Sequence, residues 1–343
     1  MEFKKLNKVV SYYSSPSLGK IDGSQRMMAL SVDKTTSNPY FGIARKITQS
    51  TGSVDVPGFV DESKLVLVES GNALSWNERG ELRIKGIQKV IDKISGKDKY
   101  FIGLEDPDIW IDDSGRKHVY FTIAFKLKER LGYKVYLGHA QGNSLDNLIA
   151  TAPILGPIGK EVDGFKEASI SPIVTNKGRL NLNEFLLWDI YEGVSAISVS
   201  LAKDMSKPWK YLRTAFDPRK TDYSWIAGHA SPCAILPKDF VSRKDLLVCI
   251  VNGREKTKTV SGQRVYGKFR PGLVLFNPRT GEIPWVSSEP LFEDIDARTI
   301  TFASDFLRTD DKEGILYAHV NDSFVRAYKL NALELLKLLP KDL

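Results

Sequence analysis

The stretch EDPDIWIDDSGRKHVYFTIA, from Glu105 to Ala124, contains the pattern that decides the fold. Acidic residues surround Pro107 at its start, the polar run DDSG indicates a turn, and an apolar, aromatic run then predicts a β-strand. The acids are either solvated loop residues or carboxylates at the rim of a binding cavity. Related stretches elsewhere in the chain help to decide between these two interpretations.

Degenerate copies of this unit recur along the sequence. Each opens on a small or acidic residue, continues through a polar turn and ends in aromatic or β-branched residues. The further copies are SSPSLGKIDGSQRMMALSV from Ser14, SISPIVTNKGRLNLNEFLLWDI from Ser169, ASPCAILPKDFVSRKDLLVCIVNG from Ala230 and FASDFLRTDDKEGILYAHV from Phe302. Repetition at this scale is typical of a fold built from similar sheets.

The spacing of the copies predicts a β-propeller. Pro107, Pro172 and Pro232 are separated by lengths on the order of the 40–50 residues of a propeller repeat plus insertions. We therefore expect an all-β chain, with residues 1–343 forming a single five-bladed β-propeller. The longer interval from Pro16 to Pro107 predicts an insertion around 54–97. A β-sandwich, or two smaller β-domains, is the alternative.

Helical periodicity is rare. The tail NALELLKLLPKDL predicts a short C-terminal helix with Leu333, Leu336 and Leu339 near one face, and GIQKVIDKI predicts a second short helix. These are small additions to the predicted propeller.

Composition and charge limit the function classes. The formal net charge is +7, but 49 basic and 42 acidic residues are mixed along the chain, which favours a solvated surface over nucleic-acid binding. The two cysteines, Cys233 and Cys249, lie in apolar runs and are expected to be buried thiols. No run reaches the roughly 18 apolar residues of a membrane span, and no secretory signal is evident. We expect a cytoplasmic protein without a membrane partner; its oligomeric state stays open.

In a propeller the starts of the innermost strands meet at one end of the central channel. The predicted starts contribute Ser14 and Ser15; Glu105 and Asp106; Lys166, Glu167 and Ser169; His229 and Ser231; and Ser304 and Asp305. Carboxylates crowded in a pocket repel one another and lose solvation, so one of them can keep its proton near neutral pH. Such a carboxyl can protonate the leaving oxygen of a glycosidic bond.

Several of these stretches resemble the five-bladed glycosidases of glycoside hydrolase families 43 and 130. EDPDIWIDDSGRKHVYF resembles their second-blade motif, KEASISP the family-43 blade that carries the acid glutamate, GHASP a late-blade motif of family 43, and SSEPLFE a closing segment of family 130. The resemblance implies that Asp106 is the pKa-tuning carboxylate of the family-43 pattern or the proton donor of the family-130 pattern. It implies that Glu167 is the general acid of the family-43 pattern and that His229 lies near the channel floor, where it orders a water or a cation.

The sequence also departs from both patterns. Family 43 has its general base on an aspartate before a proline in the first blade, where this chain reads Ser14-Ser15-Pro16. Family 130 follows Glu-Asp-Pro with arginine, where this chain has Asp108. Either inorganic phosphate is the attacking group, so that no base is needed, or the site binds sugar without turnover.

Two further features bear on the substrate. The basic segment NGREKTKTVSGQRVYGKFR, which contains Arg254, is either an anion-binding border of the channel or an exposed hairpin. Trp225 precedes GHASP and either stacks on a sugar or packs in the core. The four histidines form no metal-binding pattern, so no cofactor is expected apart from a structural cation or water near His229 and phosphate as a co-substrate.

The sequence therefore predicts an enzyme that cleaves glycosidic bonds in an oligosaccharide or glycoside by an inverting mechanism. Asp106 and Glu167 are its predicted catalytic residues. The predicted substrate-binding residues are Glu105, Lys166, Trp225, His229, Arg254 and Asp305. One alternative is an inverting glycoside phosphorylase, or a mannosyltransferase, using phosphate or an activated mannose. The other is a sugar-binding propeller without catalysis.

Overall fold

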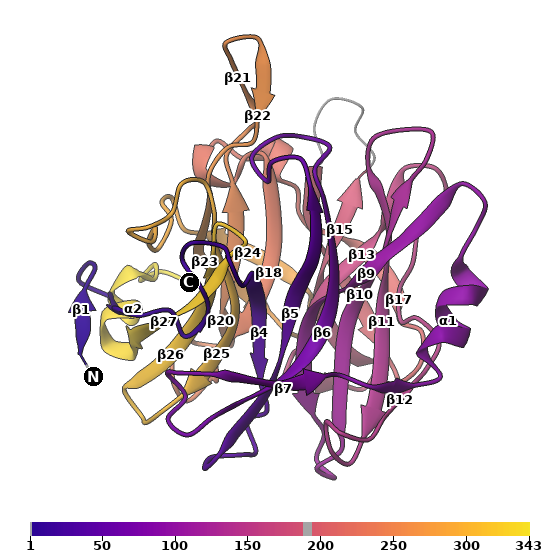
Figure 1. Cartoon of the computed structure of the whole chain (residues 1–343). Helices are drawn as coiled ribbons and strands as arrows, with labels where there is room; N and C mark the ends of the chain where they lie inside the picture. Colours follow the sequence, from indigo (N-terminus) through magenta and orange to yellow (C-terminus); the bar gives the residue numbers. More distant parts are fainter. Residues whose placement is uncertain (1, 188–193) are drawn as a thin grey trace.

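The computed structural model describes residues 2–187 and 194–343, and this part of the chain is nearly all β-strand with two α-helices (Figure 1). Most strands belong to five antiparallel meanders. The first comprises β4 (Met27–Val32), β5 (Tyr40–Thr51), β6 (Val60–Ser70) and β7 (Asn77–Glu81). The second comprises β9 (Lys99–Ile111), β10 (Lys117–Leu127), β11 (Tyr133–Gly142) and β12 (Leu148–Ala150).

The remaining meanders follow in chain order. The third comprises β13 (Val162–Ser169), β15 (Gly178–Leu187), β16 (Val194–Ala202) and β17 (Lys210–Phe216). The fourth comprises β18 (His229–Ile235), β20 (Leu246–Arg254), β23 (Phe269–Asn277) and β24 (Glu282–Val286). The fifth comprises β25 (Thr301–Arg308), β26 (Glu313–Val320) and β27 (Phe324–Asn331), and the N-terminal β2 (Val10–Tyr13) and β1 (Phe3–Lys5) complete it.

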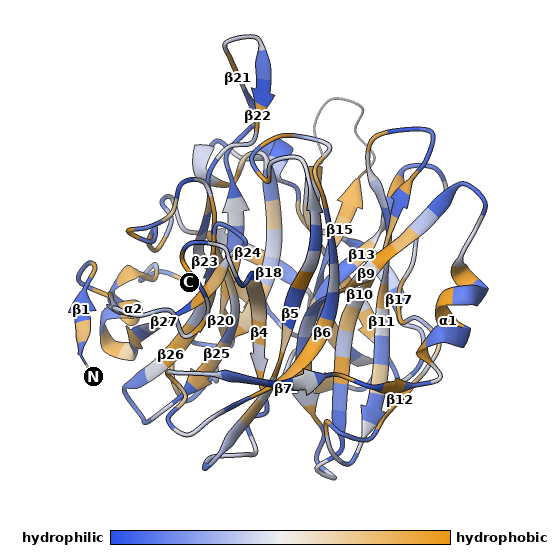
Figure 2. Ribbon diagram, viewed as in Figure 1, coloured by the Kyte–Doolittle hydropathy of each residue, from blue (hydrophilic) through white to orange (hydrophobic). Residues whose placement is uncertain are grey.

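Short elements fill the connections. They are β3 (Leu18–Gly19), β8 (Ile84–Lys85), α1 (Ile87–Ile94), β14 (Val174–Thr175), β19 (Ser242–Arg243), β21 (Lys258–Val260), β22 (Gln263–Val265) and α2 (Ala332–Leu338). Figure 1 shows β21 and β22 as a hairpin that projects from the body of the molecule, and Figure 2 shows it as mostly hydrophilic. Neither α-helix of the described residues is long and apolar enough to cross a membrane.

The first strands of consecutive meanders lie against one another. Contacts join β4 to β9, β9 to β13, β13 to β18, β18 to β25 and β25 to β4. Hydrogen bonds reinforce several of these contacts: Ile109 N donates to Ser31 Oγ at 3.0 Å, Ala168 N donates to Asp108 Oδ2 at 2.9 Å, and Val32 N donates to Asp305 Oδ2 at 2.8 Å. The first strands of the meanders are therefore brought together, although the residues that form these hydrogen bonds lie in the later halves of the strands.

Two glycines let neighbouring meanders approach. Gly103 pairs with Ser63 of β6, and Gly164 pairs with Val135 of β11, each in a parallel bridge. A Cβ at Gly103 would lie 2.2 Å from the Ser63 carbonyl oxygen, and one at Gly164 would lie 1.8 Å from that of Val135. Only glycine allows the backbones to come this close.

Hydrophobic clusters fill the spaces between meanders, including the space between the fifth and the first. Each space contains a cluster, and a pair of its residues, one from each meander, identifies it. In order from the space between the first and second meanders, the pairs are Leu65 with Phe121, Tyr120 with Phe165, Val199 with Val251, Val248 with Leu316, and Tyr317 with Met27. Cys233 and Cys249 are free thiols and are buried, which confirms the prediction made from their apolar surroundings.

Each first strand contains at least one irregularity in its pairing with the next strand, and β9 and β13 contain two. Five of these register shifts, one in each strand, lie between Met28 and Ser31, Glu105 and Asp108, Lys166 and Ala168, Pro232 and Ile235, and Ala303 and Asp305. Ala29, Asp106 and Glu167 lie in these bulges with φ values of 49°, 45° and 48°. Residues other than glycine rarely adopt this left-handed conformation, which is found mainly where a bulge redirects a side chain.

The structure corrects two predictions about local structure. Ser14 and Ser15 lie between β2 and β3, beside the last meander, so the first meander instead begins at β4. In α2 the buried side chains are Ala332 and Leu335, whereas Leu333 and Leu336 are exposed. The buried face of α2 is thus a different one from the face that leucine spacing predicts.

The segment 54–97 contains β6, β7, β8 and α1. β6 and β7 are the third and fourth strands of the first meander, so only β8 and α1 are additions to the repeated pattern. The helix predicted at GIQKVIDKI is confirmed as α1, and the C-terminal helix is confirmed as α2. That the whole chain forms a single domain stays a prediction.

Candidate functional site

A cavity of about 400 Å³ lies at the starts of the first strands. Six of the predicted site residues line it: Glu105, Asp106, Lys166, Glu167, His229 and Arg254. They come from β9, β13, β18 and β20, far apart in the sequence. Among the described residues, no group of three or more His, Cys, Asp or Glu side chains could hold a metal ion.

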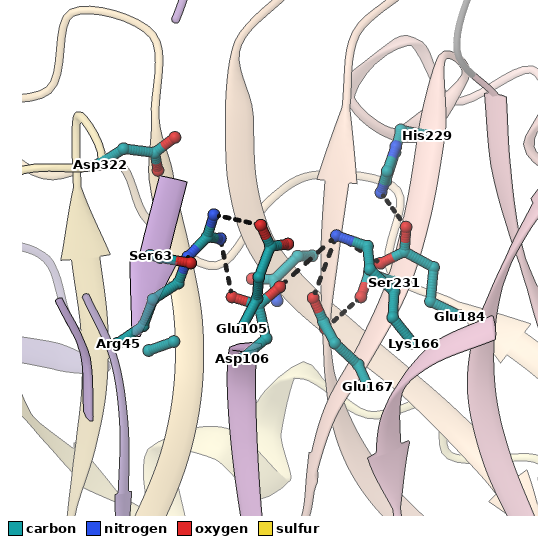
Figure 3. A network of polar contacts seen from close by, with 12 residues as sticks. Arg45, Ser63, Glu105, Asp106, Lys166, Glu167, Glu184, His229, Ser231 and Asp322 are labelled. Atoms are coloured by element: carbon teal, nitrogen blue, oxygen red, sulfur yellow. Dashed lines mark hydrogen bonds and ion pairs between the residues drawn. The ribbon is translucent and has the colours of Figure 1, made fainter. Parts of the chain in front are cut away.

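Arg45 of β5 holds the two acids of β9. Its Nη2 donates to Glu105 Oε1 at 2.7 Å, its Nη1 donates to Asp106 Oδ1 at 3.1 Å, and its Nε donates to Ser63 Oγ at 3.1 Å (Figure 3). Burial raises the pKa of Glu105 to about 7, although Arg45 opposes this shift and the Asp106 charge adds to it. Glu105 is therefore partly protonated near neutral pH.

Lys166 lies at the centre of the acidic cluster. Its Nζ is 3.7 Å from Asp106 Oδ2, from Glu167 Oε1 and from Glu184 Oε2. These carboxylates raise the pKa of Lys166 despite its burial, so it stays charged. Because Asp106 and Glu167 both lie 3.7 Å from one atom, these two oxygens are separated by no more than twice that distance.

Glu167 and Glu184 have opposite pKa shifts. Burial, together with the nearby Glu184 charge, raises the pKa of Glu167 well above its usual range, although Ser231 Oγ donates to Glu167 Oε2 at 2.5 Å. Burial also opposes ionisation of Glu184, but Lys166 and His229 outweigh it and lower the pKa of Glu184 to about 2. Glu167 is thus the more readily protonated of these two carboxyl groups.

His229 lies on the far side of Glu184 from Lys166 (Figure 3). Its Nε2 is 3.2 Å from Glu184 Oε1, and burial lowers the pKa of His229 although Glu184 opposes this. A neutral imidazole protonated at Nε2 can donate to that oxygen. The ring also packs edge-on against Phe269, with centroids 5.0 Å apart.

Arg254 is almost fully buried at the edge of the cavity. Its guanidinium lies 4.5 Å from the Tyr266 ring centroid and donates to Thr257 Oγ1 at 3.1 Å and to the Gly228 carbonyl oxygen at 3.3 Å. Of the basic segment that follows β20, Arg254 and Arg264 line the cavity. Other cations of this segment pair with acids, as Lys258 and Arg270 do with Glu255.

Two predicted site residues do not line the cavity. Trp225 is 3% exposed and packs in a hydrophobic cluster against Gly253 and Gly272, while its Nε1 donates to the Ser287 carbonyl oxygen at 3.0 Å. Asp305 binds Lys34 Nζ at 2.7 Å and, through the Val32 amide, ties β25 to β4. Both positions hold the strands together rather than facing the cavity.

Sequence reasoning missed several titratable residues that line the cavity, among them Arg45, Glu184, His319 and Asp322. Burial opposes ionisation of Asp322, but the hydrogen bond from His319, whose Nε2 is 3.2 Å away, contributes to a lowered pKa. Arg45 and Glu184 each interrupt an apolar strand, in FGIARKI and NEFLL. A charged residue within an apolar strand indicates a buried ion pair, because a charge is rarely buried unless it is paired.

The first meander provides no acid at its bulge. Ala29 occupies the position in β4 that corresponds to Asp106 in β9 and Glu167 in β13. Its methyl group cannot accept a proton. The sequence comparison with family 43 pointed to Ser14-Ser15 as the place of this departure, but in the structure the corresponding position is Ala29.

The loop between β5 and β6 lies across one side of the cavity. Val54, Pro57, Gly58 and Phe59 line it. The Asp55 carbonyl oxygen accepts from Tyr266 N at 2.9 Å, Asp55 Oδ1 accepts from Thr299 Oγ1, and the Tyr133 hydroxyl donates to the Phe59 carbonyl oxygen. The loop thus connects the first meander to segments of the second and fourth and to the start of the fifth.

No protein-family model matches this chain, and no curated protein matches its sequence. Solved structures do match. A β-1,2-mannobiose phosphorylase from Listeria innocua is 12% identical with a TM-score of 0.63, and the match covers 98% of this chain and 94% of that one. A family-130 protein, from work on hydrolases that target β-1,2-mannosidic linkages in Candida mannan, is 15% identical with a TM-score of 0.62 over 92% and 88%.

A mannose phosphorylase from Leishmania mexicana, solved with a phosphate ion, is 14% identical with a TM-score of 0.53 over 94% and 90% of the two chains. At these identities the likeness shows the fold and not the activity. It confirms that the chain has the overall fold implied by its resemblance to family 130.

Proposed function

We propose that this protein is a carbohydrate-active enzyme that cleaves glycosidic bonds with inversion, and that its meanders are the blades of a closed five-bladed propeller. The contacts that join β4, β9, β13, β18 and β25 in succession, and then β25 to β4, support closure. The site is the cavity at the starts of these strands, where charged groups from several meanders meet. The proposed function therefore depends on the residues of this cavity and not on the fold.

The position of the Glu167 carboxyl in the cavity, beside Lys166 and Ser231, is the observation that carries the proposal. The backbone of Glu167 lies in a bulge with φ 48°, its carboxyl lines the cavity, and its pKa is raised well above the usual range by burial and by Glu184. A glycosidic oxygen needs a proton as it leaves, and a carboxylic acid that stays protonated at neutral pH can supply it. Glu167 is the proposed general acid.

Asp106 is the proposed second carboxylate. It contacts both Arg45 and Lys166, and Lys166 connects it to Glu167. Inverting glycosidases have their two carboxyl groups about 6.5–9.5 Å apart. The facing oxygens of Asp106 and Glu167 both lie 3.7 Å from Lys166 Nζ, so they are at most twice that distance apart. This upper limit lies within the lower part of the inverting range. Lys166 and His229 would orient substrate hydroxyl groups.

The proposed substrate is a β-mannoside, because the phosphorylase and the hydrolases named in the matched structures act on mannosides. The test is sugar release from a panel of aryl β-glycosides and β-linked mannobioses. The configuration of the first product, followed by NMR, reports the stereochemistry. Release of the α-anomer from a β-mannoside is expected, and release of the β-anomer would overturn the inverting mechanism.

A second candidate is phosphorolysis, which Ala29 favours. The family-43 pattern takes the base that activates water from the first meander, and the bulge of that meander offers only a methyl group. Inorganic phosphate attacks without a base, and arginine binds phosphate well. Arg254 and Arg264 at the cavity edge would hold it. Release that requires phosphate and yields a sugar 1-phosphate supports this candidate; equal release in plain buffer excludes it.

A further inference from the structure

One wall of the cavity is aliphatic. A row of paired residues crosses the sheet from β6 to β15: Ser63, Gly103, Ala124, Val135, Gly164 and Leu186. Of these, Ala124, Val135 and Leu186 line the cavity together with Ile102 of β9. Ile102, Ala124 and Val135 also form a small buried cluster of their own, against which Tyr133 and Leu186 pack.

The aliphatic wall is continuous with the acidic floor. Glu184 and Leu186 both line the cavity and lie two residues apart on β15, so they share one face at a separation of roughly 7 Å. Ile102 and Glu105 likewise belong to one strand, β9. Pro57 and Phe59 of the loop between β5 and β6 also line this cavity. A molecule whose sugar reaches Glu167 would therefore extend along apolar side chains.

A sugar is a poor occupant of this wall, because its hydroxyl groups require polar partners when they are buried. Polar groups also lie beside the wall: Asp163 and Arg130 line the cavity and pair with each other at 2.6 Å, and Lys126 is a third. Lys126 follows Ala124 by two residues on β10, also lines the cavity and is 7% exposed. Its Nζ lies 4.6 Å from the Tyr133 ring centroid and has no hydrogen-bond partner among the described residues.

We propose that this wall is a leaving-group subsite, and that it takes an apolar aglycone ending in a hydrogen-bond acceptor such as a carboxylate. The inference rests on the proposed function for the sugar half of the substrate. The aliphatic row binds the body of the aglycone, and the Lys126 ammonium donates hydrogen bonds to its terminal group. The substrate class is then an amphiphilic glycoside rather than an oligosaccharide.

Calorimetry on the full chain tests the subsite with two sets of probes: methyl, butyl and octyl β-mannosides, and octanoate with octanol. Burial of each methylene should tighten binding about threefold.

Leu186→Asn should weaken the binding of octyl mannoside at least tenfold and leave that of methyl mannoside unchanged. Lys126→Met should remove the preference for octanoate over octanol. Leu212→Asn, at an exposed leucine of β17 that does not line the cavity, should change nothing.

Leu131→Asn provides a second variant without risk to folding, because Leu131 lines the cavity and is 70% exposed. It should weaken octyl mannoside by about threefold. Affinity that does not rise with chain length, or that is unchanged in Leu186→Asn, overturns the inference even if mannobiose is cleaved. Tight octanoate binding combined with no cleavage of any glycoside supports the apolar subsite and contradicts the proposed enzymatic function instead.

Discussion

Glu167 and Glu184 each have a carboxyl oxygen 3.7 Å from Lys166 Nζ, yet the pKa of Glu167 is raised and that of Glu184 is lowered. The difference arises from the remaining contacts. Glu184 also lies 3.2 Å from His229 Nε2, whereas the other neighbour of Glu167 is the neutral Ser231 hydroxyl. One lysine cannot neutralise two buried carboxylates, so the less supported one has the raised pKa.

Two substitutions should therefore shift the pH profile in opposite directions. Glu184→Gln removes the negative charge that raises the pKa of Glu167, so the alkaline limb of kcat/KM should move to lower pH by about one unit. Ser231→Ala removes a hydrogen bond that lowers the same pKa, so the limb should move to higher pH. Shifts in the same direction for both variants would refute this assignment of the limb.

Arg45→Gln should destabilise the fold strongly. It leaves Glu105 and Asp106 buried without their shared cation, and breaking a buried ion pair costs about 3–5 kcal/mol of unfolding free energy. Denaturant unfolding measures the loss. Lys64→Gln, which breaks the largely exposed pair of Lys64 with Glu81, should change the free energy by less than about 1 kcal/mol. Equal effects would mean that the Arg45 pairs contribute little.

The loop between β5 and β6 should control substrate retention. Thr299→Val removes the hydrogen bond to Asp55 and should cost about 1 kcal/mol of loop closure. Because the loop lines the cavity without contributing a proposed catalytic group, KM should rise several-fold while kcat stays within about twofold. Thr280→Val serves as a control, since Thr280 pairs with exposed Glu282 outside the cavity. A fall in kcat at unchanged KM would contradict this role.

A buried histidine pair in the second meander should make the protein acid-sensitive. His139 Nε2 lies 3.0 Å from His118 Nδ1, and burial lowers the pKa of His139 to about 3. As pH falls below about 6.5, the unfolded chain binds a proton at this residue and the folded chain does not. The free energy of unfolding should therefore fall by about 1 kcal/mol per pH unit from this group.

His139→Gln keeps a polar partner for Thr151 and removes the titration. Its unfolding free energy should depend less steeply on pH between 6.5 and about 4 than that of the unchanged protein. Identical slopes in chemical denaturation at a series of pH values would show that His139 does not govern the acid response.

Much of the site could be predicted because the chemistry is local to short motifs. Asp106 and Glu167 belong to strands whose turns and apolar runs are readable, and the structure brings both to one cavity. The first repeat was placed wrongly because β4 contains no proline, whereas Ser14-Ser15-Pro16 imitates the motif. The chain start pairs with β27, and no local pattern indicates such a long-range pairing.

Arg45 and Glu184 illustrate what the sequence hides. Both lie on the strands that follow the first strand of their meander, and their role depends on which strand faces them. Trp225 shows the opposite error, because an aromatic residue beside a site motif is as readily a core residue. Here Gly253 and Gly272 leave room for its indole, and this fit depends on strands distant in sequence.

The central claim is that Glu167 donates the proton to the leaving group. Its most direct test is the activity of Glu167→Gln on two β-mannosides: mannobiose, whose leaving sugar needs protonation, and a dinitrophenyl mannoside, whose leaving group does not. If Glu167 is the proton donor, we expect kcat/KM of Glu167→Gln to fall by over about 10²-fold on mannobiose and by only a few-fold on the aryl mannoside. Equal losses on both substrates, or this same selective loss in Asp106→Asn instead, would contradict it.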